Sequence, residues 1–145
     1  MIKSLHALLK AGTSDADRPW FAVGEYKRLP NEVGGKETTA PEDVPAAMRA
    51  LLQEYSGKGE EILDFHYRLE MIHPFRDGNG RVGRLIIFKE CLAHHIVPFI
   101  ITEELKMYYY RGLDRWEEVR GYLLDTCLTA QDRYRAILDY FRITY

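Results

Sequence analysis

The segment His73-Pro-Phe-Arg-Asp-Gly-Asn-Gly-Arg-Val-Gly-Arg84 decides what this 145-residue chain is expected to do. Glycines on both sides of Asn79 permit positive φ angles, which turn successive backbone N–H groups toward one point and create an anion-binding concavity. A helix that starts beside this turn adds the positive end of its dipole. The segment therefore predicts a site for a polyphosphate.

The charged residues of the segment suit the same ligand. Arg81 and Arg84 are three residues apart in the first turn of the following helix, so both are expected to reach phosphate oxygens. Asp77 is a hard oxygen ligand next to the phosphates, the arrangement that Mg²⁺ favours. The neutral imidazole of His73 can accept a proton near neutral pH. We interpret His73 as a general base and Asp77 as the metal ligand.

Each of these features alone has a simpler interpretation. A Gly-Asn-Gly sequence is most often a turn, and a histidine before proline most often packs or caps a helix. Their conjunction in this order favours a functional site. Phe75 is apolar within a charged loop, so we expect it to anchor that loop in the core.

Working outward, helices flank the segment. Apolar residues repeat every three or four positions before it, at Ile62, Phe65, Leu69 and Ile72, and predict a helix that ends before Pro74. After it, apolar residues cover most of the helical circumference and predict a central, buried helix: Val82, Leu85, Ile86, Ile87, Phe88, Cys91 and Leu92.

The remaining patterns complete an all-α expectation. Leu5, Leu8 and Leu9 form a stripe on a first helix that stops at Ala11-Gly12. Gly34-Gly35 indicates a tight hairpin turn, and Thr39–Glu42 has capping-box spacing for a helix to about Tyr55. An apolar connection spans residues 96–101. Thr102 is expected to start a Tyr-rich helix, and residues from Trp116 to Phe141 show further helical periodicity. We predict one domain over residues 1–145, a helical bundle with a small β-hairpin.

Composition excludes other classes. The net charge of -2 and pI near 6.2 supply no general attraction to nucleic acid or anionic lipid. No signal-peptide core and no apolar run long enough to span a bilayer are present, so we expect a cytoplasmic protein with no nucleic-acid or membrane partner. Cys91 and Cys127 form neither a disulfide framework nor a metal-ligand pair.

Several polar residues are assigned no chemistry. Adjacent helical residues point in different directions, so His94-His95 is a poor metal site, better suited to the negative end of a helix dipole. Lys3, His6, Arg133 and Arg135 are interpreted as solvated surface residues.

The segment resembles the signature of the Fic family, His-x-Phe-x-Asp/Glu-Gly-Asn-Gly-Arg-x-x-Arg, at every defined position. The similarity continues through Gly24–Lys27, Val33–Lys36, Pro41–Val44 and Tyr109-Tyr110, and so covers roughly residues 20–125. It implies a Fic-type helical core.

The resemblance implies that AMP is transferred from Mg-bound ATP to a Ser, Thr or Tyr hydroxyl of a target protein, with release of pyrophosphate. His73 would deprotonate the hydroxyl, and Asp77 would hold Mg²⁺. Nucleotide binding would involve the segment that follows, namely Gly78, Asn79, Gly80, Arg81, Val82, Gly83 and Arg84. Catalysis would consist mainly of positioning and charge stabilisation.

The resemblance also implies a flap. Val33, Gly34, Gly35 and Lys36 resemble the family's hairpin over the active site, whose edge pairs with the target as an added strand. Tyr109 and Tyr110 resemble paired tyrosines beside the nucleotide base, although a Tyr-rich helical stripe is as often core.

Regulation departs from a common family pattern. Relatives often carry a helix with Ser/Thr-x-x-x-Glu-Gly/Asn, whose glutamate pairs with the residue equivalent to Arg84; no such sequence occurs in this chain. We expect a separate antitoxin-like protein or a further N-terminal segment to supply inhibition. The isolated chain is then expected to be an uninhibited transferase, in which Arg84 has no carboxylate partner in the chain. A homodimer is left open.

Other activities compatible with the resemblance are removal of AMP, transfer of another nucleotidyl or phosphoryl group, and an inactive interaction module. Phosphate transfer is associated with lysine at the position of Arg81. The five residues His73, Asp77, Asn79, Arg81 and Arg84 together argue against an inactive module.

Overall fold

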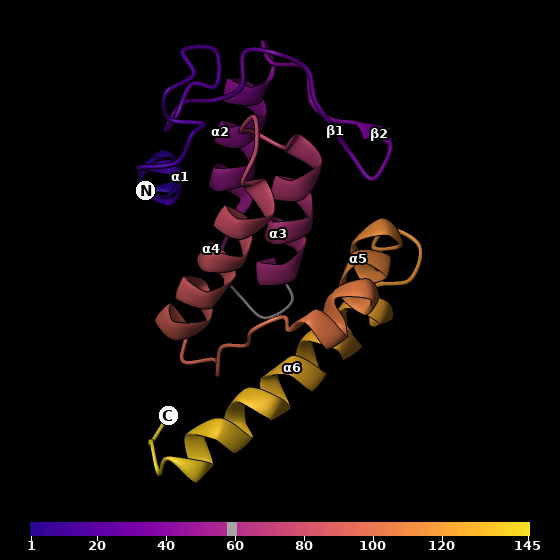
Figure 1. Ribbon diagram of the computed structural model, residues 1–145. Helices are drawn as coiled ribbons and strands as arrows, with labels where there is room; N and C mark the ends of the chain where they lie inside the picture. Colours follow the sequence, from indigo (N-terminus) through magenta and orange to yellow (C-terminus); the bar gives the residue numbers. More distant parts are fainter. Residues whose placement is uncertain (58–60) are drawn as a thin grey trace. The chain divides into compact units, whose positions relative to one another are not determined.

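The computed structural model describes residues 1–57 and 61–145. The chain forms two compact units, residues 1–86 and residues 87–145, and helix α4 (Asn79–Ala93) runs from the first into the second. Helices dominate both units (Figure 1), which confirms the predicted all-α class with a small hairpin. One domain over residues 1–145 stays a prediction.

The core of the first unit is built by helices α1 (Ile2–Lys10), α2 (Val44–Glu54), α3 (Glu61–Ile72) and the beginning of α4. Apolar residues three and four positions apart give each helix one buried face. These faces meet in a cluster that includes Met48, Leu51, Phe65, Leu69, Val82 and Ile86. Phe75 is fully buried in the same cluster, which confirms its predicted anchoring role. Its burial contributes about 2 to 3 kcal/mol.

The hairpin lies in the long loop between α1 and α2, drawn in purple in Figure 1. Strands β1 (Glu32–Val33) and β2 (Lys36–Glu37) pair antiparallel, with Glu32 opposite Glu37. Gly34 and Gly35 between them have φ of +57° and +75°. A two-residue turn with two positive φ angles needs residues without a Cβ penalty, so the Gly-Gly pair produces the predicted hairpin.

Three details of the helices differ from expectation. In α1 Leu5 and Leu9 pack against the core as expected, but Leu8 is exposed, and the most buried residues are Ile2, His6 and Lys10. Helix α2 begins at Val44 after a turn at residues 41–43, not in a capping box at Thr39; Pro45 in its first turn suits that start.

Helix α4 is apolar on one face rather than all round. Val82, Ile86 and Cys91 are buried, but Leu85 and Leu92 are each about half exposed. The prediction of a helix buried over most of its circumference, made from this apolar run, was therefore wrong for Leu85 and Leu92.

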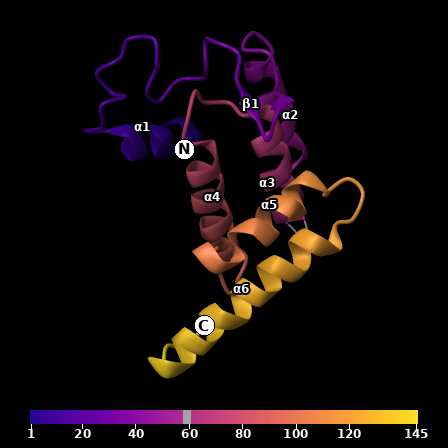
Figure 2. The same ribbon diagram turned by 45° about the vertical axis from the view of Figure 1, so that its right-hand side comes forward.

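The second unit contains a single turn η1 (Glu103–Leu105), helix α5 (Lys106–Asp114) and helix α6 (Gly121–Tyr140). Figures 1 and 2 show α5 lying along the N-terminal part of α6. The helices approach closely at Gly112, where a Cβ would lie 2.7 Å from the Leu123 Cα. Trp116 and Leu123 are buried in this unit.

The cysteines behave as predicted. Cys91 and Cys127 are free and buried, and burial raises the pKa of their thiols to about 11 and about 12. They are packing residues rather than reactive thiols. Across residues 1–57 and 61–145, no helix has the length and apolar character needed to cross a membrane.

Candidate active site

The site is built where α3 stops and the chain turns into α4. The His73 N–H still donates to Leu69 O at 3.0 Å, but Pro74 cannot continue the helix, and His73 adopts a φ of +49°. This turn directs the imidazole out of the helix. The predicted position of His73 at a helix-to-loop junction is confirmed.

The tautomer of His73 is fixed by its own turn. Nδ1 lies 3.0 Å from the carbonyl oxygen of Glu70, which can only accept a hydrogen bond. Nδ1 therefore carries the proton, and Nε2 holds the free lone pair of the neutral ring. Burial and the nearby charge of Lys27 lower the pKa of His73, opposed by the Glu70 carbonyl and Asp77. The imidazole is thus neutral at physiological pH and can accept a proton.

Asn79 holds the loop closed. Its Oδ1 accepts from Phe75 N at 2.8 Å, and its Nδ2 donates to Phe75 O at 2.8 Å. The side chain of this residue is committed to the loop, so any contact with phosphate would come from backbone N–H groups. Gly78 has the expected positive φ of +87°, but Gly80 lies in the first turn of α4 with an ordinary negative φ. The expected pair of positive-φ glycines is thus found at Gly78 but not at Gly80, and what the segment offers an anion is the helix N-terminus, whose first N–H groups have no acceptor within the helix.

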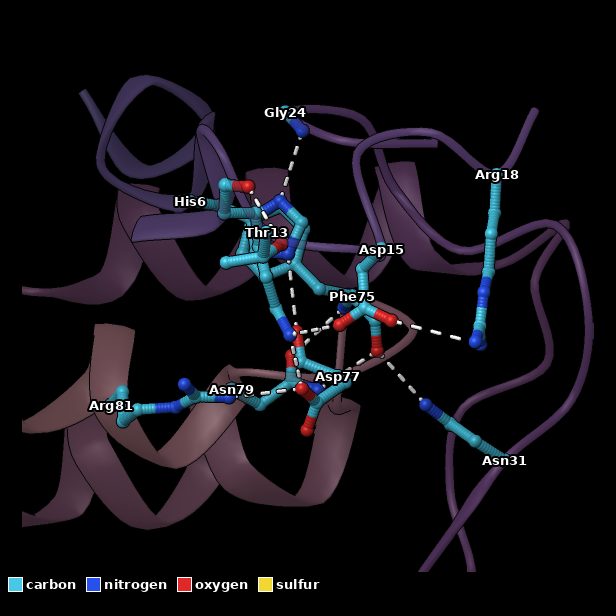
Figure 3. Close-up of polar contacts among 11 residues, drawn as sticks. His6, Thr13, Asp15, Arg18, Gly24, Asn31, Phe75, Asp77, Asn79 and Arg81 are labelled. Carbon is cyan, nitrogen blue, oxygen red and sulfur yellow. Dashed lines mark hydrogen bonds and ion pairs between the residues drawn. The ribbon is translucent and has the colours of Figure 1, made fainter. Parts of the chain in front are cut away.

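Helix α1 clamps this loop from the other side (Figure 3). The His6 ring stacks on Phe75, and its Nε2 lies 3.1 Å from Asp77 O while Gly24 N donates to its Nδ1 at 2.9 Å. Lys10, one turn later, forms ion pairs with Asp15 at 2.8 Å and with Asp77. The interpretation of His6 as a solvated residue was wrong, because its exposed fraction is 0%.

Asp77, the acid of this loop, has two basic partners. Besides Lys10, Arg81 Nη2 contacts its Oδ2 at 2.9 Å. Although partial burial acts to raise it, the pKa of Asp77 is lowered by hydrogen bonds from Lys10 and the Gly78 N–H and by the charges of Lys10 and Arg81. Asp77 is therefore ionised, and its side chain is 55% exposed.

The two motif arginines diverge. Arg81 turns to Asp77, whereas the guanidinium of Arg84 lies beside Gly80 and the carboxyl group of Glu70. Burial raises the pKa of Glu70, and the charge of Arg84 opposes this rise. This electrostatic interaction with Glu70 was not foreseen in our expectation that Arg84 has no carboxylate partner in the chain. Glu70 is buried in the turn of α3 that precedes His73, so a sequence pattern of exposed charges does not reveal it.

The hairpin is tied to the motif through Lys27 and Asn31. Lys27 Nζ donates to Asn31 Oδ1 at 2.6 Å, Thr38 Oγ1 at 2.7 Å and Ile72 O at 3.3 Å. Asn31 Nδ2 donates to Phe75 O at 2.9 Å. Burial lowers the pKa of Lys27 to about 8. The base of the hairpin and the loop after His73 thus share one hydrogen-bond network.

Sequence reasoning missed several of these contacts. His6 and Lys10 are four residues apart and therefore share one face of α1, which was the available signal. Lys27 lies within a stretch already noted for its resemblance, but its role follows only from burial. Tyr109 and Tyr110 lie in the second unit, with ring centroids 5.6 Å apart; Tyr109 is buried and Tyr110 about half exposed. Their nucleotide contact stays a prediction.

No group of three or more His, Cys, Asp or Glu side chains within the described ranges could hold a metal ion. A single exposed carboxylate such as Asp77 nevertheless fits Mg²⁺, which commonly takes one or two carboxylates and completes its octahedron with water and phosphate.

Comparison with known proteins agrees with this geometry. Residues 1–90 match the model of the Fic/DOC family, and the chain belongs to this family. It is 34% identical over 100 residues to "Protein adenylyltransferase Fic" of Nematostella vectensis, covering 64% of this chain and 23% of the relative. The protein of the same name in Drosophila willistoni is 34% identical over 97 residues, covering 62% and 20%. The chain thus spans about a fifth of the length of these relatives.

Solved structures share the fold. A Fic-domain-containing signaling protein from Bacteroides thetaiotaomicron superposes with a TM-score of 0.75 at 26% identity, over 92% of this chain and 58% of that one. A Fic-1 structure from C. elegans has a TM-score of 0.73 at 20% identity, over 97% and 43%. The second likeness concerns the fold alone.

Proposed function

We propose that this chain transfers AMP from ATP to a Ser, Thr or Tyr hydroxyl of a target protein, with release of pyrophosphate. The observation that carries the proposal is the geometry of His73, a neutral imidazole with Nδ1 bonded to Glu70 O, at the edge of the glycine turn and the N-terminus of α4. The names of the relatives point to the same reaction.

In this proposal His73 Nε2 takes the hydroxyl proton while the oxygen attacks the α-phosphorus. The bond from the α-phosphorus to the oxygen bridging the α- and β-phosphates breaks, and pyrophosphate leaves with the electron pair. The α4 N-terminal amides and the Arg81 and Arg84 guanidiniums stabilise the negative charge of the phosphates. Asp77 would hold Mg²⁺, which would neutralise charge on the phosphates and the leaving group.

We propose that the target docks along the hairpin by strand addition. The residues that support this are exposed strand edges at Glu32–Val33 and Lys36–Glu37, and a groove at the base of the hairpin lined in part by Asn31, Glu32, Glu37, Thr38 and Arg76. Unpaired strand edges recruit extended peptides through main-chain hydrogen bonds. We also propose that a separate protein or a further segment inhibits the transfer of AMP.

Labelled ATP incubated with Mg²⁺ and cell lysate tests the function. The intact protein is expected to attach AMP to itself or to a lysate protein, detected by mass spectrometry. His73→Ala should reduce labelling by about 10²-fold or more, the usual contribution of general-base catalysis. His94→Ala, which changes an exposed histidine directly after α4, serves as the matched control and should label normally. No AMP on any protein, or full labelling by His73→Ala, would contradict the proposal.

A further inference from the structure

Glu70 is a buried acid immediately next to the proposed general base. Its side chain is 6% exposed, and its Oε1 accepts no hydrogen bond from any residue that the structure describes. Burying a carboxyl group without such bonds costs free energy unless nearby charges compensate. The groups that face Glu70 therefore determine its role.

Two imidazoles and one guanidinium surround the carboxyl group. Oε2 lies 3.9 Å from His73 Nδ1, and Oε1 lies 3.9 Å from His66 Nε2. Arg84 lies on the same side, because a Cβ on Gly80 would meet Arg84 Nη1 at 3.1 Å and Glu70 Oε1 at 3.6 Å. The space for the carboxyl group exists only because residue 83 is glycine: a Cβ there would lie 2.9 Å from Oε1.

His66 supplies no positive charge to this arrangement. Complete burial and the charge of Arg84 lower its pKa to about 3, so it is neutral at physiological pH. The charged neighbours of Glu70 are therefore Arg84 permanently and His73 whenever it is protonated. This leaves His73 as the group of variable charge that can couple to Glu70.

We propose that Glu70 is a positioning residue of the transfer reaction, whose carboxylate stabilises the imidazolium formed when His73 accepts the target's hydroxyl proton. The inference rests on the proposed function, in which His73 is the base. The proton arrives at Nε2 while Nδ1 keeps its own proton on Glu70 O, and the new positive charge faces Oε2 at 3.9 Å. An opposite charge at this separation raises the pKa of a base by about 1 to 3 units.

The carboxyl group is poised to respond in this way. Burial raises the pKa of Glu70 to about 7, with Arg84 acting in the opposite direction. A positive charge on His73 favours the ionised form further, so the two groups titrate as a coupled pair. The other charges that face His73 are Lys27, which lowers its pKa, and Asp77, which raises it. Glu70 differs from both in that its Oε2 lies 3.9 Å from His73 Nδ1.

Glu70→Gln tests the inference because it removes the charge and nearly keeps the volume. NMR titration of the His73 ring in the intact chain, without nucleotide, should give a pKa lower by about one unit or more than in the wild type. In the transfer assay the acidic limb of the pH–rate profile should move to lower pH, and the plateau should fall roughly tenfold as the base weakens. A role in packing alone would not move the acidic limb.

Glu54→Gln is the matched control, because Glu54 is an exposed acid of α2 paired with Arg68 at 2.7 Å. The pKa of His73 in Glu54→Gln should equal that in the wild type. The same His73 pKa in Glu70→Gln and wild type would overturn the inference. A lowered His73 pKa in a chain that transfers no AMP would sustain the Glu70–His73 coupling and reject the proposed function instead.

If Glu70→Gln does not fold, the inference can be tested on the wild-type protein. The ¹³C signal of the Glu70 carboxyl group should change in two steps with pH, one of them at the pKa of His73, and the second step should vanish in His73→Ala. A single-step titration in the wild type would overturn the inference.

Discussion

The rings of His6 and Phe75 stack face to face, with centroids 4.0 Å apart and an interplanar angle of 5°. The contact joins a helix at the N-terminal end of the described chain to the third residue of the motif loop. His6 also bonds Asp77 O and Gly24 N, so one buried imidazole connects three segments distant in sequence. Helix α1 is therefore part of the scaffold that shapes the site.

His6→Ala should lower the free energy of unfolding by about 3 kcal/mol, because one ring stack of about 1 kcal/mol and two hydrogen bonds of about 1 kcal/mol each are lost. Urea denaturation, followed by a probe in residues 1–86, measures this loss in the free energy of unfolding. His94→Ala, which removes an exposed histidine, should stay within about 0.5 kcal/mol of wild type. Equal effects of the two substitutions would contradict the buried role of His6.

Gly83→Ala should destabilise the protein by about 1 to 3 kcal/mol, the usual cost of forcing a methyl group into a packed core. The added Cβ would lie 2.7 Å from the His66 ring and 2.9 Å from Glu70 Oε1. Gly121→Ala is the control, since no atom lies within 4 Å of its Cβ. Thermal unfolding should show Gly121→Ala unchanged or slightly more stable, because alanine is the better helix former.

Glu70 should make stability depend on pH. The unfolded chain releases this proton near pH 4.5 and the native protein near pH 7, so between these values the native state binds more protons and its free energy of unfolding falls as pH rises. Relative to wild type, Glu70→Gln should therefore gain about 3 kcal/mol between pH 4 and pH 8. Denaturant unfolding at several pH values measures this difference. A difference that does not change with pH would show that the Glu70 pKa is unshifted.

Lys10 and Asp77 should be energetically coupled across the site. Lys10 is buried, but Asp77 is about half exposed, so solvent screening limits their interaction. A double-mutant cycle with Lys10→Met and Asp77→Asn should give a coupling of about 1 kcal/mol. The surface pair Lys106–Glu103, with both side chains exposed, should give less than about 0.5 kcal/mol. Equal couplings in the two cycles would mean that the burial of Lys10 adds nothing.

Local sequence rules predicted the helices of the site well where one rule governed the position. Pro74 ends α3 wherever the rest of the chain lies, and Gly34-Gly35 makes a two-residue turn through backbone freedom alone. These rules failed where the position of a residue depended on which face of a helix is buried. Leu8 looks like a core residue and is exposed, while His6 and Lys10 look solvated and are buried, because the apolar count of a short helix does not reveal which face meets the core.

By itself the sequence determined the motif: a base, an acid, a glycine turn and a helix start, in an order that local backbone geometry converts into an anion site beside an imidazole. Only the tertiary structure decided what those residues touch. Asp77 is held by Lys10 from α1, and Glu70 of α3 lies near Arg84 of α4, because these contacts join helices packed by a shared apolar core. Charge interactions depend on distance and burial, and neither is written in the spacing of residues along the chain.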